Sequence, residues 1–507
     1  MCRNDTCQCL ETGKEWTKFM EKHYKKILKD TEDRVFSRLR IQELDEKSPW
    51  YGGFYDRDRI VQAKYTIICV EPMITLYCNP DSRYYRSSLL AQRAELGLSY
   101  IRSVQHENGL FDYVTCNFFS APDTAFCIGF FIPLYEYLSK KEERTGQEED
   151  FLRKVGEIVH DGAYGLLEGG FHTPNHRWAI ASALAKCGVL FGDKKLAESA
   201  EIYLKEGIDC NADGEFAEKS AGNYNSVNND AMLMLSDAFG DAQYEQHTIR
   251  NLHMMLTYWE PDGSIFTANS TRFDKDRLVY PLSYYMEYLA MGMKYDIPEF
   301  LGMCNTIFDI IEEKKIPSPE CLIYLMLHPE YRSFEYEGRY EQPDFARFYE
   351  DSGILRARAC LRMELYGKDV FADVFESLVG AVVDVHKGRN CHIRIQGIGI
   401  YNVAVVLGRN INSSGCQILD RVVSAAVAVF HLVGICAGSQ CHQLMSKTDC
   451  KDRYIGIVQF FNLFDNGYAL FRISRAVGQH DSVRICSEDL FCCSKRRING
   501  HFASALI

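Results

Sequence analysis

The sequence predicts a mainly α-helical protein: an (α/α) toroid of helical hairpins over residues 1–345, followed by an aberrant or truncated β-rich region over residues 346–507. Three observations support this fold class. Apolar residues recur at helical spacing in one segment after another as far as about residue 345. Short polar loops separate these segments, and no repeat of fixed period is present, which argues against tetratricopeptide or ankyrin arrays. No proline follows Pro343, and the strand-like runs lie beyond it. A ring of antiparallel helix pairs fits because it places every second loop at the same end.

The predicted helices begin and end at recognisable signals. Pro122 and Asp123 suit a first helical turn, since proline presets φ there and an acidic side chain favours the positive helix end. The stretch 175–191 carries the clearest apolar stripe, and Gly192 closes it. The other helices are expected at 86–104, 151–160, 195–207, 228–239, 246–257, 284–293 and 301–313.

The C-terminal region has an unusual composition. It contains neither proline nor tryptophan, and it includes a Cys492-Cys493 pair. Strand-like runs occur at 380–383 and 403–407, with few turn signals around them. Two explanations remain open. The region is either a genuine β-rich domain of unusual composition or a frame-shifted tail that follows a reading-frame slip after about residue 355–375.

Composition and charge limit the classes of function. The chain is 47% hydrophobic and 25% charged, as soluble globular proteins are, and it has no apolar run long enough to span a membrane. The first residues lack the basic segment and apolar core of a secretory signal, so a cytoplasmic location is expected. A net charge of −12 implies no broad basic surface, so no nucleic-acid partner is expected. An acidic substrate stays possible, because a few cationic side chains set the potential of a cleft.

The cysteines predict neither a metal site nor a disulfide framework. The 20 cysteines are irregularly spaced without a CxxC pair. Cys2, Cys7 and Cys9 cluster, but a reduced terminus is the favoured interpretation over a zinc site. No metal or cofactor is predicted, and the thiols are expected to be free.

Two short polar motifs are the strongest candidates for a functional site. Pro174-Asn175-His176-Arg177-Trp178 and Glu218-Lys219-Ser220-Ala221-Gly222-Asn223-Tyr224 each fall at a loop-to-helix junction. An amide, an imidazole and a phenol in one cleft can transfer protons. Asn175, His176 and Tyr224 are therefore the predicted catalytic residues.

Ordinary structural roles remain open for these residues. Asn175 could be a helix N-cap, which would leave His176 as a first-turn residue. Tyr224 could be a buried ring with a satisfied hydroxyl group. A phenol with an unperturbed pKa of about 10 needs nearby positive charge before it can act as a base.

Aromatic side chains beside arginines and amides are typical of sugar-binding sites. Aromatic rings stack on pyranose faces, while guanidinium and amide groups bind carboxylates and hydroxyls. The predicted substrate-binding residues are Trp50, Arg57, His106, Arg177, Trp178, Glu218, Asn223 and Arg272. The alternatives are a solvated ion-pair face for Arg57, core packing for Trp178 and a purely orienting role for Glu218.

On the basis of these motifs, the sequence resembles the heparinase II/III-like polysaccharide lyases over roughly residues 45–358. The similarity rests on the Asn-His pair that opens a helix, on the later Glu-x-Ser-x-x-x-Tyr segment, and on residues 349–358. The last segment looks like the first strand of the β-sandwich that follows the toroid in that family.

The resemblance implies β-elimination at uronic-acid residues of an acidic poly- or oligosaccharide. Asn175 or His176 would neutralise the carboxylate at C5, and a Tyr or His would remove the C5 proton. Tyr224 would protonate the leaving oxygen, and charge stabilisation of this kind is usually a large contribution to catalysis. The family's further His, and the metal that some members take from the β-domain, are not identifiable in this sequence.

Two other functions remain open. A toroidal glycoside hydrolase acting on uronosyl-containing glycans would need two carboxyl groups that flank the scissile bond, for which Asp112, Asp123 and Glu218 are candidates. A non-catalytic glycan-binding remnant would bind without turnover.

Overall fold

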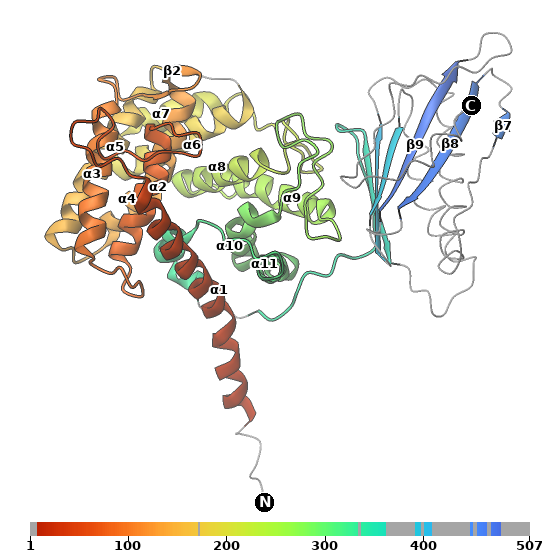
Figure 1. The fold of residues 1–507 in the computed structure, drawn as a ribbon, viewed down its shortest axis with the longest axis horizontal. Coiled ribbons are helices and arrows are strands. Elements are labelled where there is room, and N and C mark those ends of the chain that lie inside the picture. The colour runs from red at the N-terminus through yellow and green to blue at the C-terminus, as the bar shows by residue number, and fades with distance from the viewer. Residues whose placement is uncertain are drawn as a thin grey trace, which may run out of the picture. The chain divides into compact units, whose positions relative to one another are not determined.

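The computed structural model describes residues 8–170, 173–332 and 336–360, together with strand residues 391–396, 400–407, 447–449, 454–463 and 468–477. The chain divides into two compact units, Met1–Phe345 and Ala346–Ile507 (Figure 1). The first unit is helical, and the second contains a β-sheet.

Twelve α-helices occur in the described part of the first unit, so the prediction of a mainly helical chain is confirmed. They are α1 (Gln8–Arg38), α2 (Ala63–Cys78), α3 (Ser88–Val104), α4 (Ala121–Lys140), α5 (Gly146–Leu166), α6 (Pro174–Phe191), α7 (Lys194–Leu204), α8 (Tyr224–Phe239), α9 (Gln243–Tyr258), α10 (Tyr285–Tyr295), α11 (Pro298–Lys314) and α12 (Leu322–Leu327). Three 3-10 helices accompany them: η1 (Leu39–Ile41), η2 (Pro281–Tyr284) and η3 (Pro329–Arg332). A short hairpin, β1 (Phe111–Tyr113) and β2 (Asn117–Ser120), precedes α4.

Local sequence signals set the ends of α4 and α6. Pro122 lies in the first turn of α4, and the Ser120 side chain accepts the backbone N–H of Asp123 as an N-cap. Gly192 ends α6 in the left-handed conformation at φ 67°. Both features agree with the sequence predictions.

The helices α5 and α8 begin earlier than the sequence predicts. At the start of α5, Thr145 and Glu148 form a reciprocal capping box, which extends the helix toward the N-terminus. α8 begins at Tyr224 even though several asparagines in its first turns lower the helix propensity. One of these asparagines, Asn229, is buried and donates from Nδ2 to Oδ1 of Asn251 in α9 at 2.9 Å. Tertiary contacts therefore outweigh local propensity here.

The helices pack in consecutive pairs. α2 packs on α3, α4 on α5, α6 on α7, α8 on α9 and α10 on α11. The first helices of successive pairs also contact one another: α2 contacts α4, α4 contacts α6, and α6 contacts α8. The core lies between these layers and includes the fully buried rings of Phe131, Trp178 and Tyr288. The contacts described below show that the first turns of α2, α4, α6 and α8 meet at one place.

The described strands of the second unit form one seven-stranded sheet in the order β3-β4-β6-β5-β9-β8-β7. Their bounds are β3 (Phe345–Tyr349), β4 (Ile354–Cys360), β5 (Cys391–Gln396), β6 (Ile400–Leu407), β7 (Lys447–Asp449), β8 (Tyr454–Leu463) and β9 (Tyr468–Val477). The pairs β4–β6, β5–β6, β5–β9, β8–β9 and β7–β8 are antiparallel. The segment expected as one strand at 349–358 is the end of β3, a turn and most of β4. The run at 403–407 lies in β6, whereas the run at 380–383 and the Cys492-Cys493 pair lie outside the described residues.

Three properties of the described residues bear on function. None of their helices has the length and apolar character needed to cross a membrane. They contain no group of three or more His, Cys, Asp or Glu side chains that could hold a metal ion. The eight cysteines with described side chains are free thiols. The side chains of Cys2, Cys7 and Cys9 lie outside the described residues.

Candidate functional site

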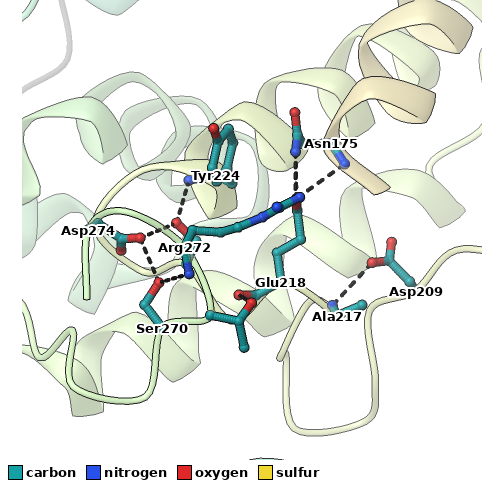
Figure 2. A network of polar contacts seen from close by, with 10 residues as sticks. Asn175, Asp209, Ala217, Glu218, Tyr224, Ser270, Arg272 and Asp274 are labelled. Carbon is teal, nitrogen blue, oxygen red and sulfur yellow. Dashed lines mark hydrogen bonds and ion pairs between the residues drawn. The ribbon is translucent and has the colours of Figure 1, made fainter. Parts of the chain in front are cut away.

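The candidate site is built around a buried carboxylate. Glu218 is 4% exposed, and its Oε1 accepts hydrogen bonds from Asn175 Nδ2 at 2.7 Å and from Arg272 Nε at 2.7 Å. Arg272 Nη2 also donates to Oε1, while Asn175 Nδ2 lies 2.9 Å from Oε2. Figure 2 shows the Arg272 side chain passing the Tyr224 ring on its way to Glu218. A buried carboxylate needs such partners, so these contacts hold three distant segments together. We refer to Asn175, His176, Glu218, Tyr224 and Arg272 as the central cluster.

Asn175 is not the N-cap of its helix. Thr173 occupies the N-cap position of α6 without a side-chain cap, and Asn175 lies within the first turn. The Asn175 side chain is 1% exposed and directs its amide nitrogen at Glu218, while its backbone N–H donates to Glu218 Oε2 at 3.2 Å. Its Oδ1 is buried and has no hydrogen-bond partner among the described residues. Asn175 therefore positions Glu218 rather than capping α6.

A second buried carboxylate, Asp274, shapes the segment between Glu218 and Tyr224. Asp274 is 1% exposed, and it accepts hydrogen bonds from the hydroxyl groups of Ser220 (2.8 Å) and Ser270 (2.6 Å) and from the backbone N–H of Gly222 (2.9 Å) (Figure 2). Lys219 adopts a left-handed φ of 52°, and Asn223, predicted to bind substrate, has the unusual angles φ −152° and ψ −69°. Such conformations are unfavourable unless the surroundings enforce them. Asp274 is therefore the anchor of this loop.

Replacing Asp274 by alanine is expected to lower the free energy of unfolding by about 2–4 kcal/mol. The change removes one acceptor and leaves buried donors unsatisfied, at a cost of roughly 1–3 kcal/mol for each group that finds no substitute. Chemical denaturation of the full chain measures the effect. Asp58→Ala is the matched control, because the Asp58 side chain is 68% exposed and pairs only with exposed Arg57 among the described residues. Equal stability of the two variants would contradict the anchoring role.

Tyr224 is the first residue of α8 and lies beside the cation of the cluster. The Arg272 guanidinium is 5.5 Å from the Tyr224 ring centroid, and Phe273 meets the ring edge-on at 5.9 Å. Burial raises the pKa of Tyr224 above its ordinary value, although the Arg272 charge opposes the shift. The phenol is therefore protonated at neutral pH. Its hydroxyl makes no hydrogen bond within the described part of the chain.

His176 occupies the first turn of α6, next to Asn175. Burial lowers the pKa of His176 below its ordinary value, although the carboxylates of Asp123 and Glu218 oppose the shift. Arg272 and Lys64 lower this pKa further. The imidazole is therefore neutral at neutral pH and can accept a proton.

A lysine and an aromatic ring connect His176 to the neighbouring helices. Phe126 in α4 meets the His176 ring edge-on at 5.9 Å. Lys64, in the first turn of α2, lies 4.5 Å from the Phe126 ring centroid, 6.0 Å from that of Tyr113 and 3.7 Å from Asp123 Oδ1. The starts of α2, α4, α6 and α8 therefore meet around the central cluster.

Two of the predicted substrate-binding residues contribute to packing instead. Arg177 pairs with Glu206 at 2.6 Å, and its guanidinium lies 4.0 Å from the Trp178 ring centroid. Trp178 is fully buried and donates from Nε1 to Asp209 Oδ1 at 2.6 Å. Asp209 also accepts the backbone N–H of Ala217 at 3.1 Å, which fixes the loop before the second motif (Figure 2). A fully buried indole has no face on which a sugar could stack.

The structure does not bring Trp50 and Arg57 to the central cluster. Trp50 is 49% exposed in the loop before α2. The Arg57 side chain is 94% exposed and pairs with its neighbour Asp58 at 3.5 Å. Within the described residues, no hydrogen bond, ion pair or ring contact joins either residue to the cluster. Arg57 thus has the solvated position that its charged surroundings in the sequence suggest.

His106 lies with the β1–β2 hairpin rather than in the central cluster. Its Nε2 is 2.8 Å from Asp112 Oδ1, and its ring stacks on Phe119 with 4.1 Å between the centroids. The sequence predictions missed Lys64, Tyr113 and Phe126. Lys64 lies in a first helical turn, the same position that singled out Asn175, but the start of α2 carries no capping signal that would have marked it.

Comparison with known proteins identifies a structural neighbour but no family. No known family model matches the chain, and no curated protein matches it. Among solved structures, the chain is similar to the Lin0763 protein from Listeria innocua, with a TM-score of 0.41 and 12% sequence identity. The similarity covers 63% of this chain and 99% of that protein.

Proposed function

We propose that the protein is a carbohydrate-active enzyme, a lyase that cleaves uronate-containing glycans by β-elimination. In this proposal the paired helices of the first unit close into an (α/α) toroid, and the central cluster lies at its open end. One observation carries the proposal: a guanidinium group held by a buried carboxylate lies 5.5 Å from the ring of a protonated phenol, and its charge lowers the pKa of a neutral imidazole. Each group has the protonation state that elimination beside a carboxylate requires.

Arg272 is the proposed group that neutralises the substrate carboxylate. Its Nε and Nη2 are fixed by Glu218, its side chain is 36% exposed, and its Nη1 makes no hydrogen bond among the described residues. A substrate carboxylate bound at Nη1 of Arg272 would be partly neutralised by the guanidinium charge. This neutralisation lowers the pKa of the C5 proton. Asn175 cannot take this role in the observed orientation, because its amide nitrogen is directed at Glu218.

His176 and Tyr224 complete the proposed reaction. The neutral imidazole removes the C5 proton, and the electron pair left on C5 forms the C4–C5 double bond as the C4–oxygen bond breaks. The Tyr224 hydroxyl donates its proton to the departing glycosidic oxygen. The products are one glycan with a free hydroxyl group and one with an unsaturated uronate end, and no water is consumed.

The helix ends favour an anionic substrate at this place. The first turns of α2, α4, α6 and α8 carry the positive ends of their helix dipoles. Lys64 adds a cation close to His176. Each of the two cations is paired with a carboxylate, Arg272 with Glu218 and Lys64 with Asp123, so the helix dipoles and the Nη1 edge of Arg272 supply the attraction for an anion.

The carboxylates of the site favour elimination over hydrolysis. Glycoside hydrolysis usually requires a pair of carboxyl groups that flank the scissile bond. Glu218 is buried and bonded to Asn175 and Arg272, and Asp112 is bonded to His106 and to the backbone N–H of Phe119. Asp123 is engaged as well, since it accepts a hydrogen bond from the Ser120 hydroxyl at 2.6 Å and lies 3.7 Å from Lys64 Nζ.

Incubation of the purified full chain with alginate, hyaluronan, heparan sulfate and polygalacturonate tests the proposal. A lyase produces unsaturated uronate ends, which absorb ultraviolet light, in proportion to new reducing ends. New reducing ends without this absorbance would establish hydrolysis. Binding without any product would favour a glycan-binding protein.

The pH dependence of kcat/KM is expected to have its acid limb below pH ~6.5, the ordinary pKa of histidine. Because the pKa of folded His176 is lowered, the imidazole becomes protonated and inactive only at more acidic pH. Asp123→Asn should move this limb further down, since the Asp123 carboxylate raises the pKa of His176. Tyr224, whose pKa is raised, should give no alkaline limb below pH ~10. An acid limb that Asp123→Asn leaves unmoved would contradict the assignment of His176 as the base.

A further inference from the structure

We propose that the β1–β2 hairpin carries a second sugar-binding subsite, formed by the stacked rings of Phe119 and His106. The substrate would then be a glycan of several units, one of which stacks on Phe119 while another reacts at the central cluster. This inference rests on the proposed function, because it assigns both sites to one glycan.

A single carboxylate bonds both the His106 ring and the backbone of Phe119. Asp112 Oδ1 lies 2.8 Å from His106 Nε2 and accepts the backbone N–H of Phe119, also at 2.8 Å. Since a carboxylate only accepts hydrogen bonds, His106 Nε2 carries a proton. The rings are 4.1 Å apart with 29° between their planes. Asp112 thus positions the His106 ring and the Phe119 backbone, and the Phe119 ring stacks on His106 without a ligand.

The position of Phe119 is hard to explain by folding alone. Its side chain is 54% exposed, so it contributes little apolar burial. Its backbone has a left-handed φ of 48°, which is unfavourable for a bulky residue. Strain of this kind is typical of sites where the conformation itself is used. An exposed ring on an unfavourable backbone, with one face stacked on His106, is suited to stacking on a ligand.

The chemistry of the surroundings favours a sugar as the occupant. A pyranose presents an apolar C–H face, which suits the Phe119 ring, and hydroxyl groups at its edge. His106 Nδ1 makes no hydrogen bond among the described residues, and the His106 side chain is 31% exposed, so it can bind a hydroxyl. Phe118 (74% exposed) and Val114 (47% exposed) also lie on the hairpin, but Phe118 stacks on no ring in the described part of the chain.

The hairpin lies next to the central cluster. β1 packs against both α2 and α4. Tyr113, at the end of β1, is close enough to Tyr224 that its charge raises the pKa of Tyr224. Ser120, directly after Phe119, donates to Asp123 Oδ2 at 2.6 Å at the start of α4. A glycan bound at Arg272 can therefore extend along this side toward Phe119.

A chain-length series tests the subsite. With Phe119→Ala, KM for long uronate oligosaccharides is expected to rise about three- to tenfold with kcat unchanged, as loss of one ring stack of ~0.5–1.5 kcal/mol predicts. The shortest cleavable oligosaccharide should show no change. Phe118→Ala is the matched control and should behave as the wild type does, because Phe118 is exposed on the same strand and stacks on no ring in the described part of the chain. An unchanged KM in Phe119→Ala, or an equal increase in both variants, would overturn the inference.

Affinity measurements keep this test independent of turnover. If no glycan yields an unsaturated product, the proposed function fails, and affinity electrophoresis of the wild type and Phe119→Ala on the same glycans still decides the subsite. Weaker retardation of Phe119→Ala alone would support it. Absence of retardation for the wild type would overturn it. The inference would also be overturned if Phe119→Ala were retarded as strongly as the wild type but no longer self-associated, since the ring would then contact another protein copy.

Discussion

Replacing Tyr224 by phenylalanine is expected to lower kcat about a hundred- to ten-thousandfold, the usual contribution of general acid–base catalysis. The variant removes only the hydroxyl group, which makes no hydrogen bond among the described residues, so fold and ring contacts should be preserved. Glycan affinity should stay within about twofold of the wild type, because Arg272 and the buried network are untouched. Initial rates of unsaturated product formation measure the loss, and calorimetry measures the affinity.

Tyr113→Phe is the control for this experiment. Tyr113 is another phenol close to the site, and it lies near Lys64 without touching the central cluster through any hydrogen bond in the described part of the chain. It should retain most of the activity. Full activity in Tyr224→Phe would remove the acid role, and a loss confined to Tyr113→Phe would transfer that role to the hairpin.

Replacing Arg272 by glutamine is expected to lower kcat/KM about a hundred- to thousandfold, as removal of one charge-stabilising donor does in other enzymes. The change removes the cation that neutralises the substrate carboxylate. It also leaves Glu218 as a buried charge bonded only to Asn175, so stability should fall as well. Kinetics and denaturation must therefore be measured together.

The double variant Arg272→Gln with Glu218→Gln separates these two effects. It removes both charges, so most of the lost stability should return while activity stays low. Arg277→Gln controls for the loss of a cation, because Arg277 lies exposed over Phe273 (5.6 Å) in the same loop and makes no contact with Glu218 among the described residues. Recovery of activity in the double variant would contradict the assignment of Arg272 to the substrate carboxylate.

The sequence predicted the helical character and the residue types of the site because both depend on local patterns. Apolar periodicity located most helices, and Pro122 and Gly192 marked helix ends with a direct backbone reason. The polar motifs at two helix starts drew attention to Asn175 and Tyr224. The structure places both residues around the same buried carboxylate, Glu218.

The contacts between distant segments could not be predicted in the same way. Glu218 and Arg272 lie in separate loops, and no spacing rule relates them. Asp274 belongs to a charged run that is typical of a solvated face. Its side chain is nevertheless buried, and it accepts hydrogen bonds from three donors in the surrounding loops. The β1–β2 hairpin was missed because strands of three and four residues show no periodicity.

The capping box of α5 shows a different kind of miss. The Thr145-x-x-Glu148 pattern was visible in the sequence and has a known mechanism, so the helix start could have been predicted. In the first motif a local signal is present but misleading: Asn175 lies at a helix start and has the features of an N-cap, although Thr173 occupies that position. Only the buried partner Glu218 shows that its side chain turns away from the helix end.

The most direct test of β-elimination at this site is turnover in water labelled with heavy oxygen. The account predicts that cleavage of a uronate-containing glycan by the full chain leaves both new ends without the label, because no water enters the products. One product should be lighter than the corresponding hydrolysis product by one water. Heavy oxygen in a newly formed reducing end, lost when Tyr224 or Arg272 is replaced, would show that this site hydrolyses the glycan and would contradict the account.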